Sequence, residues 1–329
     1  MFTEIFTAVV ASLVSALITL IFTPLIAERM RKKGMVGVDV HKQHKPEVPE
    51  MCGISILIGL IVSTLVSLII LWKYAVDFLT FLSVVLLSGM VGAVDDLKRL
   101  GPRIKPLLTA LASFPILLTG AYDPRPLLPL IGRVRLTIVY RLLIPLAIAV
   151  PSNAVNMMDT LNGVMSGTCS IVVFVLMISA VMLGHWNAAI LGASLLGSLL
   201  AFYHYNKFPS RVFPGNVGDL AVGAAIGALV VLGRIEAIGV TAMMPHIMNG
   251  FYFLASVGGF YERRQIPARP IRVLDDGRLA ASSDPNSPLT LTRTILAVGP
   301  MREEEVVHCF FLLTAFSGLL SFLTMFMMM

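Results

Sequence analysis

The sequence is poor in charged residues, and this shortage argues against several classes of protein. Asp, Glu, Lys and Arg make up 13% of the 329 residues, whereas a soluble domain carries about 25%. Hydrophobic residues make up 57%, and the mean hydropathy is +0.86. A soluble chain of this size could not bury so much apolar surface. A soluble enzyme, a disordered chain and a nucleic-acid-binding module are therefore disfavoured.

Cysteine is scarce as well. The chain has three cysteines, none of them in a CxxC pair, and each lies in or beside an apolar stretch: Cys52, Cys169 and Cys309. We interpret them as small buried hydrophobic residues. The sequence also lacks a low-complexity tract or a recognisable soluble domain. We therefore expect one integral-membrane domain over residues 1–329.

Long apolar stretches are what the sequence has in abundance. A helix needs about 20 residues to cross the hydrocarbon core, and backbone polar groups in lipid must be paired within the segment. The sequence therefore predicts an all-α polytopic membrane protein with about ten transmembrane helices. Their predicted ranges are 4–27, 53–72, 76–94, 105–121, 136–152, 163–184, 187–205, 217–233, 238–260 and 306–326.

The distribution of Lys and Arg predicts the orientation of the chain. With the N-terminus outside, the connections that follow odd-numbered spans hold 19 of the 25 Lys and Arg residues. Cytoplasmic loops are enriched in these residues, so the formal charge of +6 is a topology signal. We expect both termini outside and cytoplasmic loops at about 28–52, 95–104, 153–162, 206–216 and 261–305.

The last cytoplasmic loop carries two patterns of local structure. Residues 271–274 and 278–281 flank an Asp-Gly turn at Asp276-Gly277, which predicts a small β-hairpin. Residues 289–298 precede Gly299-Pro300 and read as a short amphipathic helix on the membrane surface.

Polar residues that could carry chemistry form five clusters, and every cluster follows an odd-numbered span. They lie at 39–50, at Asp95-Asp96, at 153–163, at 213–219 and at 261–269. Taken singly, each could be a helix cap, a charged loop or, at Lys105, a side chain that snorkels to the interface. Their shared side of the membrane favours one common site.

The spacing within 153–163 suggests how part of that site is built. Asn156 and Asp159 are three residues apart, so on a helix they can share a face. Asn162-Gly163 is expected to end that helix. Polar side chains this close to a membrane-spanning helix are energetically costly unless they have a partner.

The acidic residues predict a metal ion. Two carboxylates ~5 Å apart at an effective dielectric of 20 repel by about 3 kcal/mol, so a site shared by Asp95, Asp96, Asp159 and Asp219 needs a cation. All candidate ligands are oxygens, which suits Mg²⁺, with Mn²⁺ as the other candidate. The nearby Lys and Arg suit phosphates. The sequence therefore predicts metal-assisted phosphoryl transfer to a lipid at the membrane surface.

These motifs resemble the polyprenyl-phosphate N-acetylhexosamine-1-phosphate transferases, which are glycosyltransferases of the family 4 type. Within that family the chain looks most similar to the UDP-GlcNAc:dolichyl-phosphate GlcNAc-1-phosphate transferases. The resemblance runs nearly end to end, from Pro49-Glu50 with Gly53, through the motifs at 94–105, 153–163 and 218–219, to Arg263–Pro267 and Gly299-Pro300.

The resemblance implies a role for each matching residue. Asn156 and Asp219 would hold Mg²⁺, Lys105 would contact the phosphates, and Asp95 and Asp96 would line the reaction centre. Asp159 joins this catalytic group, although it matches the bacterial branch of the family better than the eukaryotic one. The implied substrate-binding residues are Val40, Glu50, Asn162, Gly163, Arg263, Arg264 and Gln265. The eukaryotic pattern has Arg where Gln265 stands.

The implied reaction transfers GlcNAc-1-phosphate from UDP-GlcNAc to dolichyl or another polyprenyl phosphate, releasing UMP. This is the first membrane step in the synthesis of lipid-linked oligosaccharides for N-glycosylation. The implied partners are these two substrates and the bilayer, with no nucleic acid; the family includes dimers. The short connection before the last span favours a prokaryotic plasma membrane, archaeal ones included, over the endoplasmic reticulum.

Other functions stay open at this point. A related transferase could use undecaprenyl phosphate or another UDP-HexNAc for cell-wall or surface polysaccharides. Outside the enzyme class, an ion-coupled transporter would also place acids within the membrane, but the sequence shows no repeated halves with broken helices. A scaffolding protein would have little reason to collect carboxylates and amides in this way.

Overall fold

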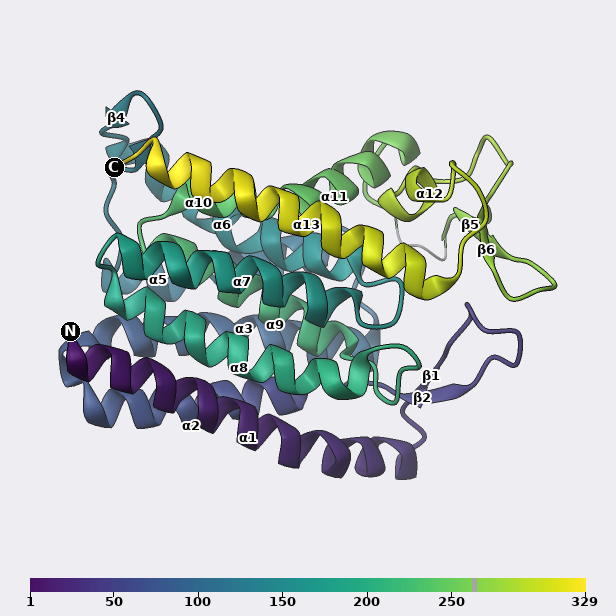
Figure 1. The fold of residues 1–329 in the computed structure, drawn as a ribbon, viewed down its shortest axis with the longest axis horizontal. Coiled ribbons are helices and arrows are strands. Elements are labelled where there is room, and N and C mark those ends of the chain that lie inside the picture. The colour runs from purple at the N-terminus through teal and green to yellow at the C-terminus, as the bar shows by residue number, and fades with distance from the viewer. Residues whose placement is uncertain (262–264) are drawn as a thin grey trace.

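The computed structural model describes residues 1–261 and 265–329. These residues form long helices that lie side by side along the longest axis of the molecule (Figure 1). Both termini lie at one end. The two hairpins β1–β2 and β5–β6 and the short helix α12 gather at the other end (Figure 1). This arrangement agrees with the predicted placement of both termini on one side of the membrane.

Seven helices of the described residues are long and apolar enough to span a membrane. They are α1 (Phe2–Lys32), α3 (Ala75–Lys98, preceded by a 3-10 turn at Trp72–Tyr74), α6 (Thr137–Met158), α7 (Val164–Met182), α8 (Trp186–Asn206), α9 (Gly215–Leu232) and α13 (Glu303–Phe326). Their length and composition confirm a polytopic, mostly helical membrane protein.

The predicted number of ten continuous spans is not confirmed. The span expected at 53–72 is α2 (Ile54–Ile70), which has 17 residues. The span expected at 105–121 is broken into α4 (Ile104–Leu111) and α5 (Phe114–Thr119), and that at 238–260 into α10 (Glu236–Ala242) and α11 (Met244–Val257). Pro115 and Pro245 open the second helix of each pair, a position that proline favours because it lacks an N–H group. The apolar composition continues across both breaks, so hydropathy did not reveal them.

Helix α9 lies at the centre of the bundle. Of the residues of α9, 89% are buried, and the helix packs most extensively against α3 and α6. Glycine and alanine recur along it, at Gly223, Ala224, Ala225 and Gly227 among others. Small residues let helix backbones approach closely in a membrane protein. The ends of α3 and α6 are therefore brought directly against the beginning of α9.

Two glycines set the distance between these backbones. A Cβ atom on Gly92 of α3 would overlap the backbone carbonyl of Asn216 at the start of α9. A Cβ atom on Gly53, just before α2, would overlap the backbone of Gly218. Only a residue without a side chain fits at either position without moving a helix.

The strands form three antiparallel hairpins. The predicted hairpin is confirmed as β5 (Ile271–Val273) and β6 (Leu279–Ala281), with Gly277 at φ +82° in its turn. The sequence analysis did not predict β1 (Val36–Val38) with β2 (Glu47–Pro49), or β3 (Leu127–Leu128) with β4 (Gly132–Arg133). These strands have two or three residues each, too few for an alternating pattern to be visible.

The predicted amphipathic helix at 289–298 is shorter than expected. Helix α12 covers Leu291–Ile295, and the Thr290 side chain caps it by accepting a hydrogen bond from the Arg293 N–H. Leu296, just after the helix, is buried in a second hydrophobic cluster with Met158 of α6 and Val306 of α13. The segment packs partly against protein, while Val298 at its end is 86% exposed.

The close approach at Gly92 gives a stability prediction. Gly→Ala inside a helix normally stabilises by about 0.5–1 kcal/mol, but overpacking costs about 1–3 kcal/mol. Gly92→Ala should therefore lower the unfolding free energy by about 1–2 kcal/mol, measured as a lower thermal midpoint in detergent. Gly101→Ala is the control, because its Cβ would make ordinary contacts with Ile104. Equal or greater stability of Gly92→Ala would contradict the packing described here.

Candidate active site

The end of α3, the end of α6 and the beginning of α9 meet at the end of the bundle opposite the termini. The last turns of α3 supply Asp95 and Asp96, and the last turn of α6 supplies Asn156. The first turns of α9 supply Asn216 and Asp219. Helix α4 begins beside them and adds Lys105. We call these six residues the acidic cluster. The predicted convergence of the motifs at 95–96, 105, 156 and 219 is thus observed.

Asp96 caps the beginning of α9. Its Oδ1 accepts hydrogen bonds from the backbone N–H of Asn216 at 2.9 Å and from the Asn216 side chain at 2.8 Å. Its Oδ2 accepts the backbone N–H of Val217 at 3.0 Å. A carboxylate is favourable there because the first N–H groups of a helix are unpaired and the N-terminal end is electropositive. Asp96 therefore joins α3 to α9.

Lys105 carries positive charge into the cluster. Its ammonium lies 2.5 Å from Asp95 Oδ2 and donates to Asn216 Oδ1 at 3.2 Å and Asn156 Oδ1 at 3.4 Å. Asp95 is 6% exposed, and its Oδ1 accepts the backbone N–H of Leu100 at 2.6 Å. Within residues 1–261 and 265–329, Asp95 is the one aspartate of the cluster with an ion-pair partner.

Asp219 has the chemistry of a metal ligand. It is 4% exposed, and its Oδ2 accepts a hydrogen bond from Asn156 Nδ2 at 3.0 Å. Its Oδ1 is buried and has no hydrogen-bond partner. An unpartnered buried carboxylate oxygen is costly, and a hard cation with oxygen ligands would satisfy it. The oxygens of Asn156 and Asn216 lie in the same cluster, so the donor set fits Mg²⁺.

Protein carboxylates alone do not complete such a centre. In the described ranges, no three His, Cys, Asp or Glu side chains are grouped so that they could hold a metal ion. Mg²⁺ is commonly held by one or two carboxylates, with substrate phosphates and water completing its shell. The cluster therefore matches an ion that is bound together with a phosphate-bearing substrate.

The prediction that Asn156 and Asp159 share a helix face is wrong. Helix α6 ends at Met158, and Asp159 leaves the helical conformation at φ −75° and ψ 78°. Its carboxylate turns toward α7 and accepts the backbone N–H of Met165 at 3.2 Å. Burial there raises the pKa of the Asp159 carboxyl above its usual range. This contact supports a structural role, in which the Asp159 carboxylate holds the first turn of α7.

The prediction that Asn162-Gly163 ends the helix is wrong by four residues, because α6 already ends at Met158 and Gly163 directly precedes α7. Asn162 lies in the turn between the two helices and is held by protein groups. It is 6% exposed; its side-chain amide donates to Asp39 at 3.0 Å, and its backbone N–H donates to Glu303 at 2.9 Å. Gly163 has φ +82° and lies close to Tyr203. A side chain at that position would be strained.

The remaining predicted substrate residues lie in the loops at the same end. Val40 is 49% exposed and lines a cavity of about 360 Å³ between β1–β2 and β5–β6. Glu50 and Gln265 are exposed, and Glu50 packs against Gly37 of β1. Arg263 and Arg264 lie outside the described residues.

The sequence analysis missed Asn216 as a site residue. It lies between the other members of the cluster, because it donates to Asp96, accepts from Lys105 and accepts from Asn156 at 2.7 Å. It was visible only as part of a Pro-Gly-Asn turn. The signal that could have identified it is its position three residues before Asp219, one helical turn away on the same face.

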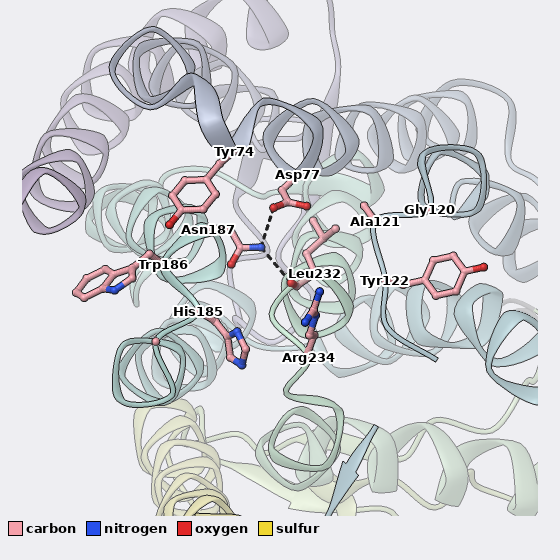
Figure 2. Close-up of a pocket in the computed structure, with 11 residues that line it drawn as sticks. Tyr74, Asp77, Gly120, Ala121, Tyr122, His185, Trp186, Asn187, Leu232 and Arg234 are labelled. Atoms are coloured by element: carbon pink, nitrogen blue, oxygen red, sulfur yellow. Dashed lines mark hydrogen bonds between the residues drawn. The ribbon is translucent and has the colours of Figure 1, made fainter. Parts of the chain in front are cut away.

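A second cavity, of about 300 Å³, lies at the opposite end of the bundle (Figure 2). Tyr74, Trp186 and Arg234 contribute to its lining. Asn187 donates hydrogen bonds to Asp77 at 2.9 Å and to the carbonyl of Leu232 at 3.1 Å, so the polar groups there pair across α3, α8 and α9 (Figure 2). This network closes the bundle at the end that holds the termini, far from the acidic cluster.

Comparison with known proteins places the chain in a family. The model of glycosyl transferase family 4 matches residues 78–234, the region from α3 to the end of α9 that holds the acidic cluster. The phospho-N-acetylmuramoyl-pentapeptide-transferase of Moorella thermoacetica is 32% identical over 260 residues, which cover 74% of this chain and 79% of that protein. The chain belongs to glycosyl transferase family 4. The resemblance drawn from the motifs is thereby confirmed.

Two archaeal proteins match this family 4 chain over more of its length. Each is named as a candidate UDP-N-acetylglucosamine–dolichyl-phosphate N-acetylglucosaminephosphotransferase. The protein of Saccharolobus solfataricus is 28% identical over 303 residues, and that of Sulfolobus acidocaldarius is 27% identical over 305 residues. Both matches cover 90% of this chain and 89% of the relative.

The buried ion pair between Asp95 and Lys105 of this family 4 protein predicts that the two side chains contribute jointly to the free energy of unfolding. Lys105→Met should destabilise strongly, because it leaves the Asp95 carboxylate buried without its cation. In the double variant Asp95→Asn/Lys105→Met, the loss should be smaller than the sum of the single losses by about 1–3 kcal/mol. Unfolding of the four proteins in detergent measures this difference. Additive losses would show that the pair is not coupled.

Proposed function

We propose that this protein transfers GlcNAc-1-phosphate from UDP-GlcNAc to dolichyl or another polyprenyl phosphate and releases UMP. The membership in glycosyl transferase family 4 and the names of the two archaeal relatives support this reaction. The helical bundle supports it as well, because one substrate is a lipid and the other is water-soluble. Their reaction needs a site at the membrane surface, and the position of the acidic cluster at the ends of the apolar helices α3 and α6 supports such a site.

The observation that carries the proposal is the unpartnered Oδ1 of Asp219 beside Lys105 and two amide oxygens. Asp219 and Asn156 would hold Mg²⁺, with Mn²⁺ as a substitute, and the Asn216 oxygen lies within the same cluster. When bound, the ion neutralises charge on the diphosphate in phosphoryl transfer.

The chain's own residues would position the two phosphates. An oxygen of the polyprenyl phosphate attacks the β-phosphorus of UDP-GlcNAc; a new P–O bond forms, and the bond from that phosphorus to the oxygen of UMP breaks. Lys105 donates to phosphate oxygens, and Asp95 holds its ammonium in place. Asp96 aligns the beginning of α9. A phosphate monoester is already largely ionised at neutral pH, so direct displacement needs no protein nucleophile.

The nucleotide sugar would lie toward the loops. Asn162 and Gly163 would border the uridine, with Val40 and Glu50 nearby. Arg263 and Arg264 would face the phosphate and the sugar, and Gln265 would face the sugar. We place this end of the molecule in the cytoplasm of a prokaryote, since the connections at this end hold most of the Lys and Arg.

The main alternative is a different nucleotide-sugar donor or a different acceptor lipid. The relatives from Moorella and Bacillus species are phospho-N-acetylmuramoyl-pentapeptide-transferases, so the same cluster could serve another UDP-HexNAc derivative or undecaprenyl phosphate. Purified protein incubated with Mg²⁺, polyprenyl phosphates and labelled UDP-sugars separates these reactions by which pair releases UMP and yields a charged lipid.

Asp219→Asn should abolish UMP release while the protein stays folded. The substitution keeps the size of the side chain but removes the charge and one oxygen that face the ion, and loss of such transition-state stabilisation lowers turnover by about 100-fold or more. The control Asp276→Asn removes a carboxylate from the exposed β5–β6 turn, where it pairs with Arg278. Full activity of Asp219→Asn would refute the metal assignment.

A further inference from the structure

A ring of buried polar interactions lies beside the acidic cluster and is distinct from it. Asn162 donates to Asp39 with its side chain and to Glu303 with its backbone N–H. Lys42 closes the ring, because its ammonium pairs with Asp39 Oδ2 at 3.4 Å and also with Glu303 Oε2. Two carboxylates, one ammonium and the side-chain and backbone N–H groups of Asn162 therefore bind one another in a closed circuit.

The ring joins segments that are distant in the sequence. Asp39 and Lys42 lie in the β1–β2 connection, Asn162 in the turn between α6 and α7, and Glu303 is the first residue of α13. Asn162 is 123 residues from Asp39 and 141 residues from Glu303. No local secondary structure would hold these three segments together.

The side chains of the ring are shielded from water, so the loss of any one of them should strongly affect the others. Asp39 is 5% exposed, Glu303 and Asn162 are 6% exposed, and the Lys42 side chain is 13% exposed. The Lys42 ammonium also lies 4.3 Å from the centre of the Phe208 ring, a favourable cation–π contact. Removing one member of a buried charge network leaves the others without compensation.

The ring borders groups that bind substrate in the proposed reaction. Asn162 follows Asn156 of the acidic cluster by six positions in the sequence. Val40, between the two ring residues of the hairpin, lines the cavity of about 360 Å³ together with Lys42, Lys45 and the tip of β5–β6. Gln43 donates to the carbonyl of Asp275 across that cavity. A shift of the ring would move Asn162 and the cavity at Val40 relative to the acidic cluster.

We propose that Asp39, Lys42 and Glu303 are positioning residues for the nucleotide sugar. They hold the Asn162–Gly163 turn against the β1–β2 hairpin and so set the affinity for UDP-GlcNAc, while the polyprenyl phosphate binds independently of them. This inference rests on the proposed function. Among the described residues, no hydrogen bond or ion pair joins Asp39, Lys42 or Glu303 to the proposed metal ligands Asn156 and Asp219, so the ring acts through Asn162.

Steady-state kinetics of Glu303→Gln test this role. Glutamine keeps the side-chain size and an oxygen that can accept the Asn162 N–H, but it removes the charge that Lys42 pairs with. Hydrogen bonds to charged groups imply a rise in KM for UDP-GlcNAc of about tenfold or more. KM for polyprenyl phosphate and kcat should stay within about twofold.

Matched variants separate positioning from general stability. Lys42→Met should raise KM for UDP-GlcNAc further, and Lys42→Arg should restore it to within about threefold of wild type. Glu304→Gln removes a neighbouring exposed carboxylate, and Lys32→Met removes the cation of an exposed pair with Glu28; neither should change either KM.

Three results would overturn the inference, and the third can be distinguished from the first two. An active wild type with unchanged KM for UDP-GlcNAc in both Glu303→Gln and Lys42→Met would refute the ring's role alone. The same holds if these variants lose turnover only in proportion to the fraction of folded protein, with no change in KM. A wild type that releases no UMP from any UDP-sugar would refute the proposed function and this inference with it.

Discussion

The site depends on one constraint, which is that several buried acids must be compensated where the ends of three helices meet. Asp95 is balanced by Lys105, and Asp96 is balanced by the first N–H groups of α9. Asp219 keeps one oxygen without a partner. The protein thus neutralises most of its own charge and leaves one strong acceptor, which is what a site for a cation and a phosphate substrate requires.

The packing of the bundle makes this arrangement possible. Gly92 and Gly53 let α3 and α2 approach the beginning of α9 at backbone distance, so that Asp96 reaches the α9 N–H groups directly. The loops then add a second layer, in which the ring of Asp39, Lys42, Asn162 and Glu303 joins the β1–β2 connection, the α6–α7 turn and the beginning of α13. Helix packing therefore positions the acidic cluster, and buried charges in the loops position the segments beside it.

Much of the fold could be predicted from the sequence, because a bilayer requires long apolar helices and biases Lys and Arg toward one side. All ten apolar segments became helices, and the motifs converged at one end. The breaks near Ser113 and Met243 were invisible, since composition does not change there. Asp159 was misplaced because the helical spacing rule fails once α6 ends at Met158. The roles of Asn216 and Glu303 depend on contacts with residues more than 100 positions away, which local patterns do not encode.

The proposed binding of one divalent ion at Asp219 is the claim on which the rest depends. Electron paramagnetic resonance of purified protein titrated with Mn²⁺ in the presence of UDP-GlcNAc measures it directly, without turnover. The wild type should bind a single ion, and Asp219→Asn should bind it about tenfold more weakly or worse, because one carboxylate fewer faces the ion. Equal affinity and stoichiometry in the two proteins would contradict the assignment of the metal to this cluster.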